Sequence, residues 1–238
     1  MQKKTANATL EATQTEPLSP VIGATNWAKK LLPDELAKAI EGTLEKRVPA
    51  GAYVCHKGEP VEHWIGVIEG LVKISNYSFE GKAMTFSGIP SGGWFGEGSL
   101  LKNEIRRYDA VALQDARIAY LNRKTFQWLL DHSIGFNRFL LTQLNERLGQ
   151  TLSTIESHGL LGPDGRVACC LAGLFNPVLH PGFGSQLKIS QEELGYLTNL
   201  SRQRVNQALQ LLSEKKLLKA AYGRIEILDI AGLRSFTG

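Results

Sequence analysis

The stretch ISQEELGYLTNLSRQRVNQALQLLSEKKLL, residues 189–218, decides how the C-terminal part of this chain folds. Ser190 followed by Glu193 has the spacing of a capping box, which predicts the start of a helix. Gly195 is small where two helices must cross closely, and Asn199 tolerates the left-handed backbone conformation of a tight turn. The stretch therefore predicts a short helix that ends in a turn near Asn199.

A second helix is expected directly after this turn. Ser201 can cap it, and Val205, Leu209 and Leu212 recur at the spacing of one inward face. A helix, a tight turn and a capped second helix make a helix-turn-helix. We expect the second helix, over residues 201–213, to enter the DNA major groove with its first turns against base edges.

The outward face of this second helix carries arginines and amides, which suit base edges. Arginine matches guanine O6 and N7, and glutamine matches adenine N6 and N7. The following LLKAAYGRIEIL, residues 217–228, predicts a hairpin around Tyr222 and Gly223, a wing whose basic side chains would contact phosphates. The candidate DNA-binding residues are Ser190, Gln191, Ser201, Arg202, Gln203, Arg204, Asn206, Gln207, Lys219 and Arg224.

The region before this motif has a different pattern. Ten glycines fall between Gly51 and Gly98, with short apolar runs between them, and alternation at period two continues to Asn122. Glycines at turn spacing between half-buried runs predict many short strands, and so a sandwich, roll or barrel. The chain is therefore expected to be α+β, with its strands gathered in the first half.

A long helix is expected between these two parts, after a short one over residues 124–132. A 3-4-3-4 spacing runs through Leu141, Leu144, Leu148, Thr151 and Ile155, flanked by Leu152; it is the seam of two paired helices and predicts a homodimer. The alternative is a helix that lies on its own domain. The candidate dimerisation residues are Leu141, Leu144, Leu148, Leu152 and Ile155.

These patterns divide the chain into four parts. Residues 1–25 lack a sustained period and are expected to form a disordered tail. A roll-type domain is expected over 26–132, beginning with a helix from near Asn26 to Glu45, followed by the dimerisation helix over 133–161. The winged helix-turn-helix is expected over 162–238. Its residues 186–238 hold eight Lys/Arg against five Asp/Glu, a basic bias that suits nucleic acid but also an ordinary solvated surface.

Composition excludes several classes of protein. The 238 residues are 43% apolar and 21% charged with a net charge of +4, the balance of a globular protein with a real core. No run approaches the ~18 apolar residues that span a bilayer. No apolar segment of a secretory signal follows Lys3 and Lys4. Cys55, Cys169 and Cys170 offer neither a disulfide framework nor a zinc spacing, so a cytoplasmic protein is expected.

The order of roll, long helix and winged helix-turn-helix resembles the Crp/Fnr family of bacterial transcription regulators. The matching pieces are PAGAYVCHKGEP (49–60), VIEGLVKI (67–74), GGWFGEGSLL (92–101) and ISQEELGYLTNLSRQRV (189–205). The resemblance implies a double-stranded β-roll (jelly roll) that is sensory and related to cyclic-nucleotide-binding folds. It also implies dimerisation through the long helix, binding to a two-fold operator near promoters, and RNA polymerase as a partner.

The resemblance also implies a ligand site in the roll, which this sequence matches in part. Gly96 and Glu97 match the phosphate-binding turn, Arg107 the phosphate-binding arginine, and Thr151 a hydroxyl that reaches the base. Nucleotide binders carry a small hydroxyl where this chain has Tyr108. Asp109 adds a negative charge beside it, and Leu152 replaces a second polar group. These departures argue against cyclic AMP, and the alternative is a Glu97–Arg107 ion pair in a roll that senses something else.

The sequence offers few residue patterns that would indicate another cofactor or a catalytic site. No cysteine precedes Cys55, so an iron–sulfur cluster near the N-terminus is not expected. Neither a haem ligand nor a metal site can be nominated from the scattered histidines, and no nucleophile–base arrangement stands out, so no enzyme is expected. These histidines are His56, His63, His132, His158 and His180.

We therefore expect a homodimeric, sequence-specific DNA-binding regulator whose effector the sequence does not identify. The alternative is a small-molecule-binding module whose C-terminal helical domain contacts protein. Such a protein-docking helix would expose apolar residues where positions 202–210 carry amides and arginines. An enzyme on a cupin-like roll would need a metal or a catalytic constellation.

Overall fold

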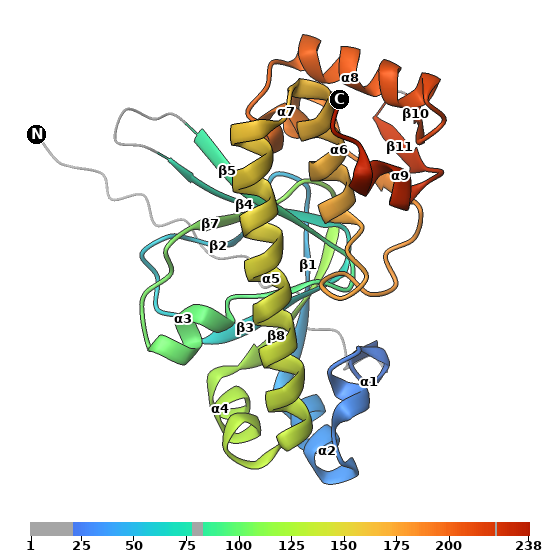
Figure 1. Cartoon of the computed structure of the whole chain (residues 1–238). Helices are drawn as coiled ribbons and strands as arrows, with labels where there is room; N and C mark the ends of the chain where they lie inside the picture. Colours follow the sequence, from blue (N-terminus) through green and yellow to red (C-terminus); the bar gives the residue numbers. More distant parts are fainter. Residues whose placement is uncertain (1–20, 78–82, 222) are drawn as a thin grey trace, which may run out of the picture.

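In the computed structural model, which describes residues 21–77, 83–221 and 223–238, the glycine-punctuated region folds into two four-stranded antiparallel sheets (Figure 1). The first sheet has the order β1-β8-β3-β6, formed by Thr43–Val48, Ala116–Asn122, His63–Glu69 and Trp94–Phe95. The second has the order β2-β7-β4-β5, formed by Tyr53–Cys55, Asp109–Ala112, Leu71–Tyr77 and Ala83–Pro90. A short helix, α3 (Glu97–Lys102), follows β6.

The two sheets are held together by apolar side chains on their facing sides. Successive side chains of a strand point to opposite faces, so one face of each sheet supplies this core. Val67, Val72, Ile89, Phe95 and Ile118 are buried in one cluster between the sheets. The expected β-roll is confirmed.

The N-terminal segment differs from the expectation. The helix expected from Asn26 to Glu45 is interrupted: a 3-10 turn η1 (Ala28–Lys30) is followed by α2 (Pro33–Glu41), and β1 begins at Thr43. Leu31 and Leu32 are both extended, and for Leu32 the reason is that the residue directly before a proline avoids helical geometry.

The expected tail over 1–25 is wrong at its end. Residues 1–20 lie outside the described residues, but Val21–Ala24 forms a helical turn, α1, and Ile22 is fully buried.

Aromatic rings join this N-terminal segment to the roll. Trp27 lies 5.3 Å from Trp64 and 5.2 Å from Trp94 between ring centroids, and Trp64 and Trp94 are 4.4 Å apart. Phe126 of α4 (Arg123–His132) and Phe136 of α5 (Ile134–Leu160) complete the cluster. This aromatic cluster therefore connects the first sheet to the N-terminal segment, to α4 and to α5.

The long helix α5 begins at a buried carboxylate. Ser133 caps it by accepting from the Phe136 N–H, and the Ser133 hydroxyl donates to Glu35 Oε2 at 2.8 Å. The same Glu35 oxygen accepts from the Leu32 N–H at 2.8 Å, so one side chain links the N-termini of α2 and α5. From this point α5 runs along the roll to the C-terminal helices (Figure 1).

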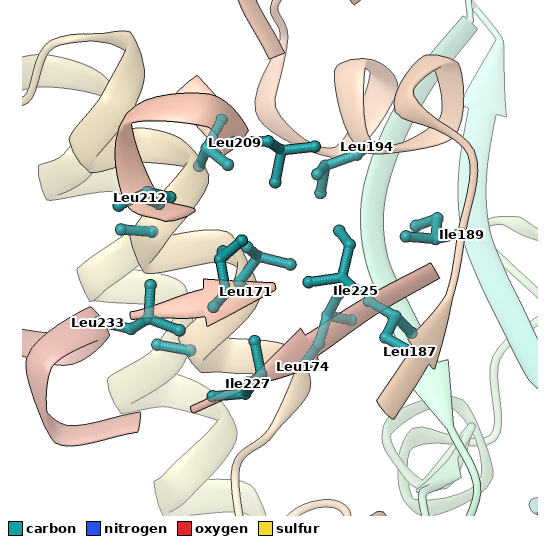
Figure 2. Close-up of a cluster of buried hydrophobic side chains, with 14 of the residues drawn as sticks. Leu171, Leu174, Leu187, Ile189, Leu194, Leu209, Leu212, Ile225, Ile227 and Leu233 are labelled. Atoms are coloured by element: carbon teal, nitrogen blue, oxygen red, sulfur yellow. The ribbon is translucent and has the colours of Figure 1, made fainter. Parts of the chain in front are cut away.

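The C-terminal domain surrounds its own leucine-rich core. Its elements are α6 (Pro163–Leu174), β9 (Gln186–Lys188), α7 (Gln191–Thr198), α8 (Arg202–Glu214), β10 (Leu218–Ala221), β11 (Arg224–Ile227) and α9 (Ile230–Ser235). Leu171, Leu194, Leu212 and Ile225 point into this core from α6, α7, α8 and β11 (Figure 2). The strands pair in the order β10-β11-β9, which makes the hairpin of a winged domain.

The C-terminal domain packs directly against the roll. Leu71 of β4 belongs to the C-terminal core, and a side chain at Gly88 of β5 would lie 2.8 Å from Leu174. Lys73 Nζ of β4 lies 2.9 Å from Glu193 Oε1 of α7. Within the described residues, no helix combines the length and hydropathy needed to cross a membrane.

We expect Gly66→Ala to destabilise the protein, because Gly66 of β3 lies against the aromatic cluster. An added Cβ would lie 2.5 Å from a ring carbon of Trp94, and Trp94 is itself only 3% exposed. Overpacking of this kind costs about 1–3 kcal/mol in free energy of unfolding, measurable by urea denaturation. Gly98→Ala in α3 is the matched control, because no described atom lies within 4 Å of its added Cβ. A variant Gly66→Ala as stable as the control would contradict the packing described.

Candidate nucleic-acid interface and internal cavity

The two helices of the expected motif are positioned by local hydrogen bonds. Ser190 caps α7 by accepting from the Glu193 N–H at 3.1 Å, and Ser201 caps α8 by accepting from the Arg204 N–H at 3.3 Å. Between them, Asn199 has φ 53° and ψ 47°, the left-handed conformation. A side chain at Gly195 would lie 2.7 Å from the Leu200 carbonyl oxygen. The helix-turn-helix is confirmed with the residues that predicted it.

The capping box itself is only half formed. The Glu193 carboxylate accepts two hydrogen bonds from Lys73 Nζ, at 2.9 and 3.1 Å. Lys73 also lies 5.5 Å from the centre of the Tyr196 ring. Glu193 therefore connects the first helix of the motif to strand β4, because a facing ammonium group offers its carboxylate a stronger partner than a backbone amide.

The candidate DNA-binding residues share the solvent side of this domain. Val205, Ala208, Leu209 and Leu212 of α8 are buried, and the opposite face of the helix is polar. The exposed members are Ser190, Ser201, Arg202, Gln203, Arg204, Gln207, Lys219 and Arg224. Tyr222, expected at the tip of the wing, lies outside the described residues.

Two side-chain pairs order this face. Gln191 Nε2 donates to Asn206 Oδ1 at 2.9 Å and so joins α7 to α8; both residues are half-buried. Arg204 donates to Gln207 Oε1 at 2.8 Å along α8. The sequence showed the residue types but not these pairs, because each depends on how the helices cross.

A hollow of about 800 Å³ lies where the two helices and the wing meet. Arg202, Gln203 and Asn206 line it from α8, and Gly223 lines it from the hairpin. Glu192, which sequence reasoning did not select, adds a carboxylate here and accepts from the Tyr196 hydroxyl at 3.1 Å. The hollow thus offers donors and acceptors from three elements to one occupant.

In the roll, the expected Glu97–Arg107 ion pair is wrong. Glu97 is 3% exposed; its Oε1 lies 3.3 Å from Arg147 Nε of α5, and its Oε2 accepts from Trp64 Nε1 at 3.4 Å. Arg107 instead donates to Glu104 at 2.8 Å on the surface, with 69% of its side chain exposed.

Arg106, not Arg107, points into the roll. Arg106 is 3% exposed, and a side chain at Gly96, whose φ is 95°, would lie 2.6 Å from Arg106 Nη1. Ala110 and Ala112 of β7 lie in the core between the sheets, and counting back from them in steps of two reaches residues 108 and 106. Adjacent arginines made the assignment ambiguous in the sequence.

Tyr108 lies over this arginine. The Arg106 guanidinium carbon is 5.7 Å from the centre of the Tyr108 ring, and Tyr108 packs against Phe95 with ring centroids 6.5 Å apart. Burial raises the pKa of the Tyr108 phenol, which therefore stays protonated. Arg106 Nη1 has no hydrogen-bond partner among the described residues.

A cavity of about 470 Å³ lies between β5, α5 and the C-terminal domain. Its lining includes Phe86 and Ile89 of β5, Tyr108, Thr151 of α5 and Leu197 of α7. Of the five expected ligand residues, Tyr108 and Thr151 reach this cavity, whereas Gly96, Glu97 and Arg107 do not line it.

The candidate dimerisation residues form a stripe on α5. Leu141, Leu148, Leu152 and Ile155 are 67%, 58%, 58% and 65% exposed. At about 100° of rotation per residue, all four fall within roughly 60° of one another. Leu144 differs, because it is half-buried against the aromatic cluster of its own chain.

Comparisons with known proteins match both halves of the chain. The model of a cyclic nucleotide-binding domain matches residues 45–133, and that of a Crp-like helix-turn-helix domain matches residues 165–236. The cAMP-activated global transcriptional regulator CRP of Haemophilus influenzae is 29% identical over 178 residues, covering 73% of this chain and 79% of the relative.

Two further matches, both from Thermus thermophilus, extend the comparison. The transcriptional regulator SdrP is 29% identical over 189 residues, covering 78% of this chain and 90% of the relative. The crystal structure of a transcriptional regulator of the CRP/FNR family superposes with a TM-score of 0.56 at 26% identity, covering 82% of this chain and 100% of that one.

We expect the stability of the protein to fall between pH 7 and pH 5 because of His180. Burial, with the charge of Arg147 nearby, lowers the pKa of His180 from 6.5 to about 3, so the native state keeps it neutral while the unfolded chain binds a proton. The contribution of neutral His180 to the free energy of unfolding is complete above pH 6.5 and is lost as the pH falls. The loss between pH 7 and pH 5 is about 2 kcal/mol in free energy of unfolding.

Urea denaturation of His180→Asn measures this contribution. Between pH 7 and pH 5, the free energy of unfolding of the variant should fall by about 2 kcal/mol less than that of the parent. His132→Asn, at an exposed histidine of α4, is the control for the substitution itself. Equal slopes for all three proteins would contradict a buried neutral His180.

Proposed function

This chain belongs to the Crp/Fnr family and is a DNA-binding transcription regulator, and from that premise we propose that it acts as a homodimer on a two-fold-symmetric DNA site. We further propose that a small molecule sensed at the β-roll controls it, that it works in the cytoplasm, and that RNA polymerase is a partner at the promoter. The observation that carries the proposal is the polar, exposed face of α8.

We propose that α8 contacts bases and that the wing contacts phosphates. Arg202 and Gln203 are exposed on the first turn, where a recognition helix meets base edges. A guanidinium matches guanine and an amide matches adenine. Lys219 and Arg224, exposed on the wing, are positioned for phosphates.

The stripe on α5 supports the homodimer. Isolated apolar residues are common on protein surfaces, but a line of large apolar side chains on one helix marks an interface. Pairing two copies along this stripe would bury it and relate two α8 helices by a two-fold axis. Half-sites one helical turn of DNA apart then suit the dimer.

The alternative of a module that docks on protein through its C-terminal domain has less support. An interface core is depleted of charge and enriched in aromatic and apolar groups. From Arg202 to Gln210, the exposed residues are polar or charged.

We expect Leu148→Asp to yield monomers and to weaken operator binding steeply, because a charge in the stripe loses its solvation on pairing and each half-site is then bound alone. Sedimentation velocity and gel-shift titration measure the two effects. Leu160→Asp is the control: Leu160 is 76% exposed on the same helix but about 100° away from the stripe. A Leu148→Asp dimer, or monomers from the control as well, would contradict the assigned interface.

We expect an operator that keeps a G·C pair opposite Arg202, with A·T pairs beside it matched to Gln203 and Gln207. Arg202→Ala should cost ~1–3 kcal/mol in binding free energy and relax preference at that position. Arg204→Ala, if it loses a phosphate contact, should weaken all sequences alike and reduce the salt slope by about 1.

Selection from a random duplex library, followed by anisotropy titrations at several salt concentrations, measures these effects. Arg234→Ala is the matched control, an exposed arginine on α9 in the same domain. Unchanged base preference in Arg202→Ala would show that this side chain does not contact bases.

A further inference from the structure

We infer that the cavity between β5, α5 and α7 binds an uncharged, largely apolar small molecule and not a cyclic nucleotide. This inference rests on the proposed function, since it names the class of effector that the roll would sense. The volume of the cavity, about 470 Å³, lies within the range of small-molecule binding sites.

Of the two buried arginines near the cavity, one is engaged by an acidic group and the other does not line the cavity. Arg147 reaches the cavity, but its guanidinium pairs with Glu97 at 3.3 Å and donates to the Trp94 carbonyl oxygen at 2.7 Å. Arg106 does not line the cavity, whereas Tyr108, whose ring centre lies 5.7 Å from the Arg106 guanidinium carbon, does. A phosphate in the cavity would therefore meet no free cation at either arginine, and burying it without one is costly.

Three polar side chains of the lining have hydrogen-bond partners within the protein. The Thr151 hydroxyl donates to the Arg147 carbonyl oxygen at 2.8 Å, and the Thr154 hydroxyl donates to that of Gln150 at 2.9 Å. The His180 Nδ1 lies 3.1 Å from the Leu174 carbonyl oxygen, and burial keeps this imidazole neutral. At these three side chains an occupant would find few unmatched donors or acceptors.

The walls of the cavity leave large apolar side chains in contact with water. Met84 and Phe86 of β5 are 62% and 48% exposed. Burying such surface is favourable by about 25 cal/mol per Å². An apolar occupant would gain this contribution, whereas a charged one would lose its hydration.

The position of the cavity would couple its occupant to DNA binding. Phe86 and Ile89 belong to the roll, whereas Leu179 and Leu197 belong to the C-terminal domain, and all four line the cavity. A ligand here contacts both domains at once. If it fits one relative arrangement of the domains better than another, it shifts the equilibrium between them.

The test uses the full-length protein and N-phenyl-1-naphthylamine, an uncharged fluorophore whose emission rises in apolar surroundings. The wild type should bind it saturably, and excess cyclic AMP should not displace it. Its anionic relative 1-anilinonaphthalene-8-sulfonate should bind at least about tenfold more weakly. Ser87→Phe, which places a phenyl group in the lining, should weaken binding of the uncharged probe by about tenfold or more. Ser185→Phe adds the same group on an exposed loop and should change nothing.

Several results would overturn the inference. Displacement of the probe by cyclic AMP, or preference for the anionic dye, would show a site for charged ligands. Equal binding by Ser87→Phe and Ser185→Phe would place the probe elsewhere. Binding by the monomeric Leu148→Asp variant but not by the wild type would show that a second copy fills the cavity.

Operator binding, measured separately by anisotropy, distinguishes failure of this inference from failure of the proposed function. A protein that binds its operator but not the probe fails only this inference. A protein that binds the probe but no DNA fails the proposed function.

Discussion

The carbonyl oxygen of Trp94 fixes how the long helix lies on the roll. It accepts from Arg147 Nη2 at 2.7 Å and from Gln143 Nε2 at 3.3 Å, two side chains one turn apart on α5. Arg147 is held in turn by Glu97, directly after the β6 strand that contains Trp94. One face of α5 is thereby held against the roll, and the leucine stripe faces outward.

The C-terminal motif was predictable from the sequence because its signals are local. Ser190 and Ser201 accept from backbone N–H groups three residues later, and Asn199 acts through its own left-handed backbone, so their spacing alone describes the turn. Gly195 adds a contact across that turn, with Leu200 only five residues away. Motifs of this kind need no knowledge of the rest of the fold.

The candidate site in the roll was only partly predictable, because its partners are distant in sequence. Glu97 meets Arg147 across fifty residues, and no local pattern distinguishes that arginine from the nearer Arg107. The same holds for Leu144, whose spacing fits a dimer seam although its side chain packs on the aromatic cluster. In the N-terminal segment, by contrast, Pro33 was a local signal that apolar periodicity outweighed in the prediction.

The tryptophan chromophores of the protein are confined to the part of the chain that contains the aromatic cluster. All four tryptophans, Trp27, Trp64, Trp94 and Trp128, precede α5, and three of them lie within 5.3 Å of one another between ring centroids. Coupled transitions among rings this close dominate near-ultraviolet circular dichroism, and tryptophan emission arises from the same half of the chain. Spectroscopy on these chromophores therefore follows the roll and its helices directly, while the DNA-binding half is silent to them. A comparison with far-ultraviolet signals, to which every helix contributes, separates the unfolding of the two halves without any label.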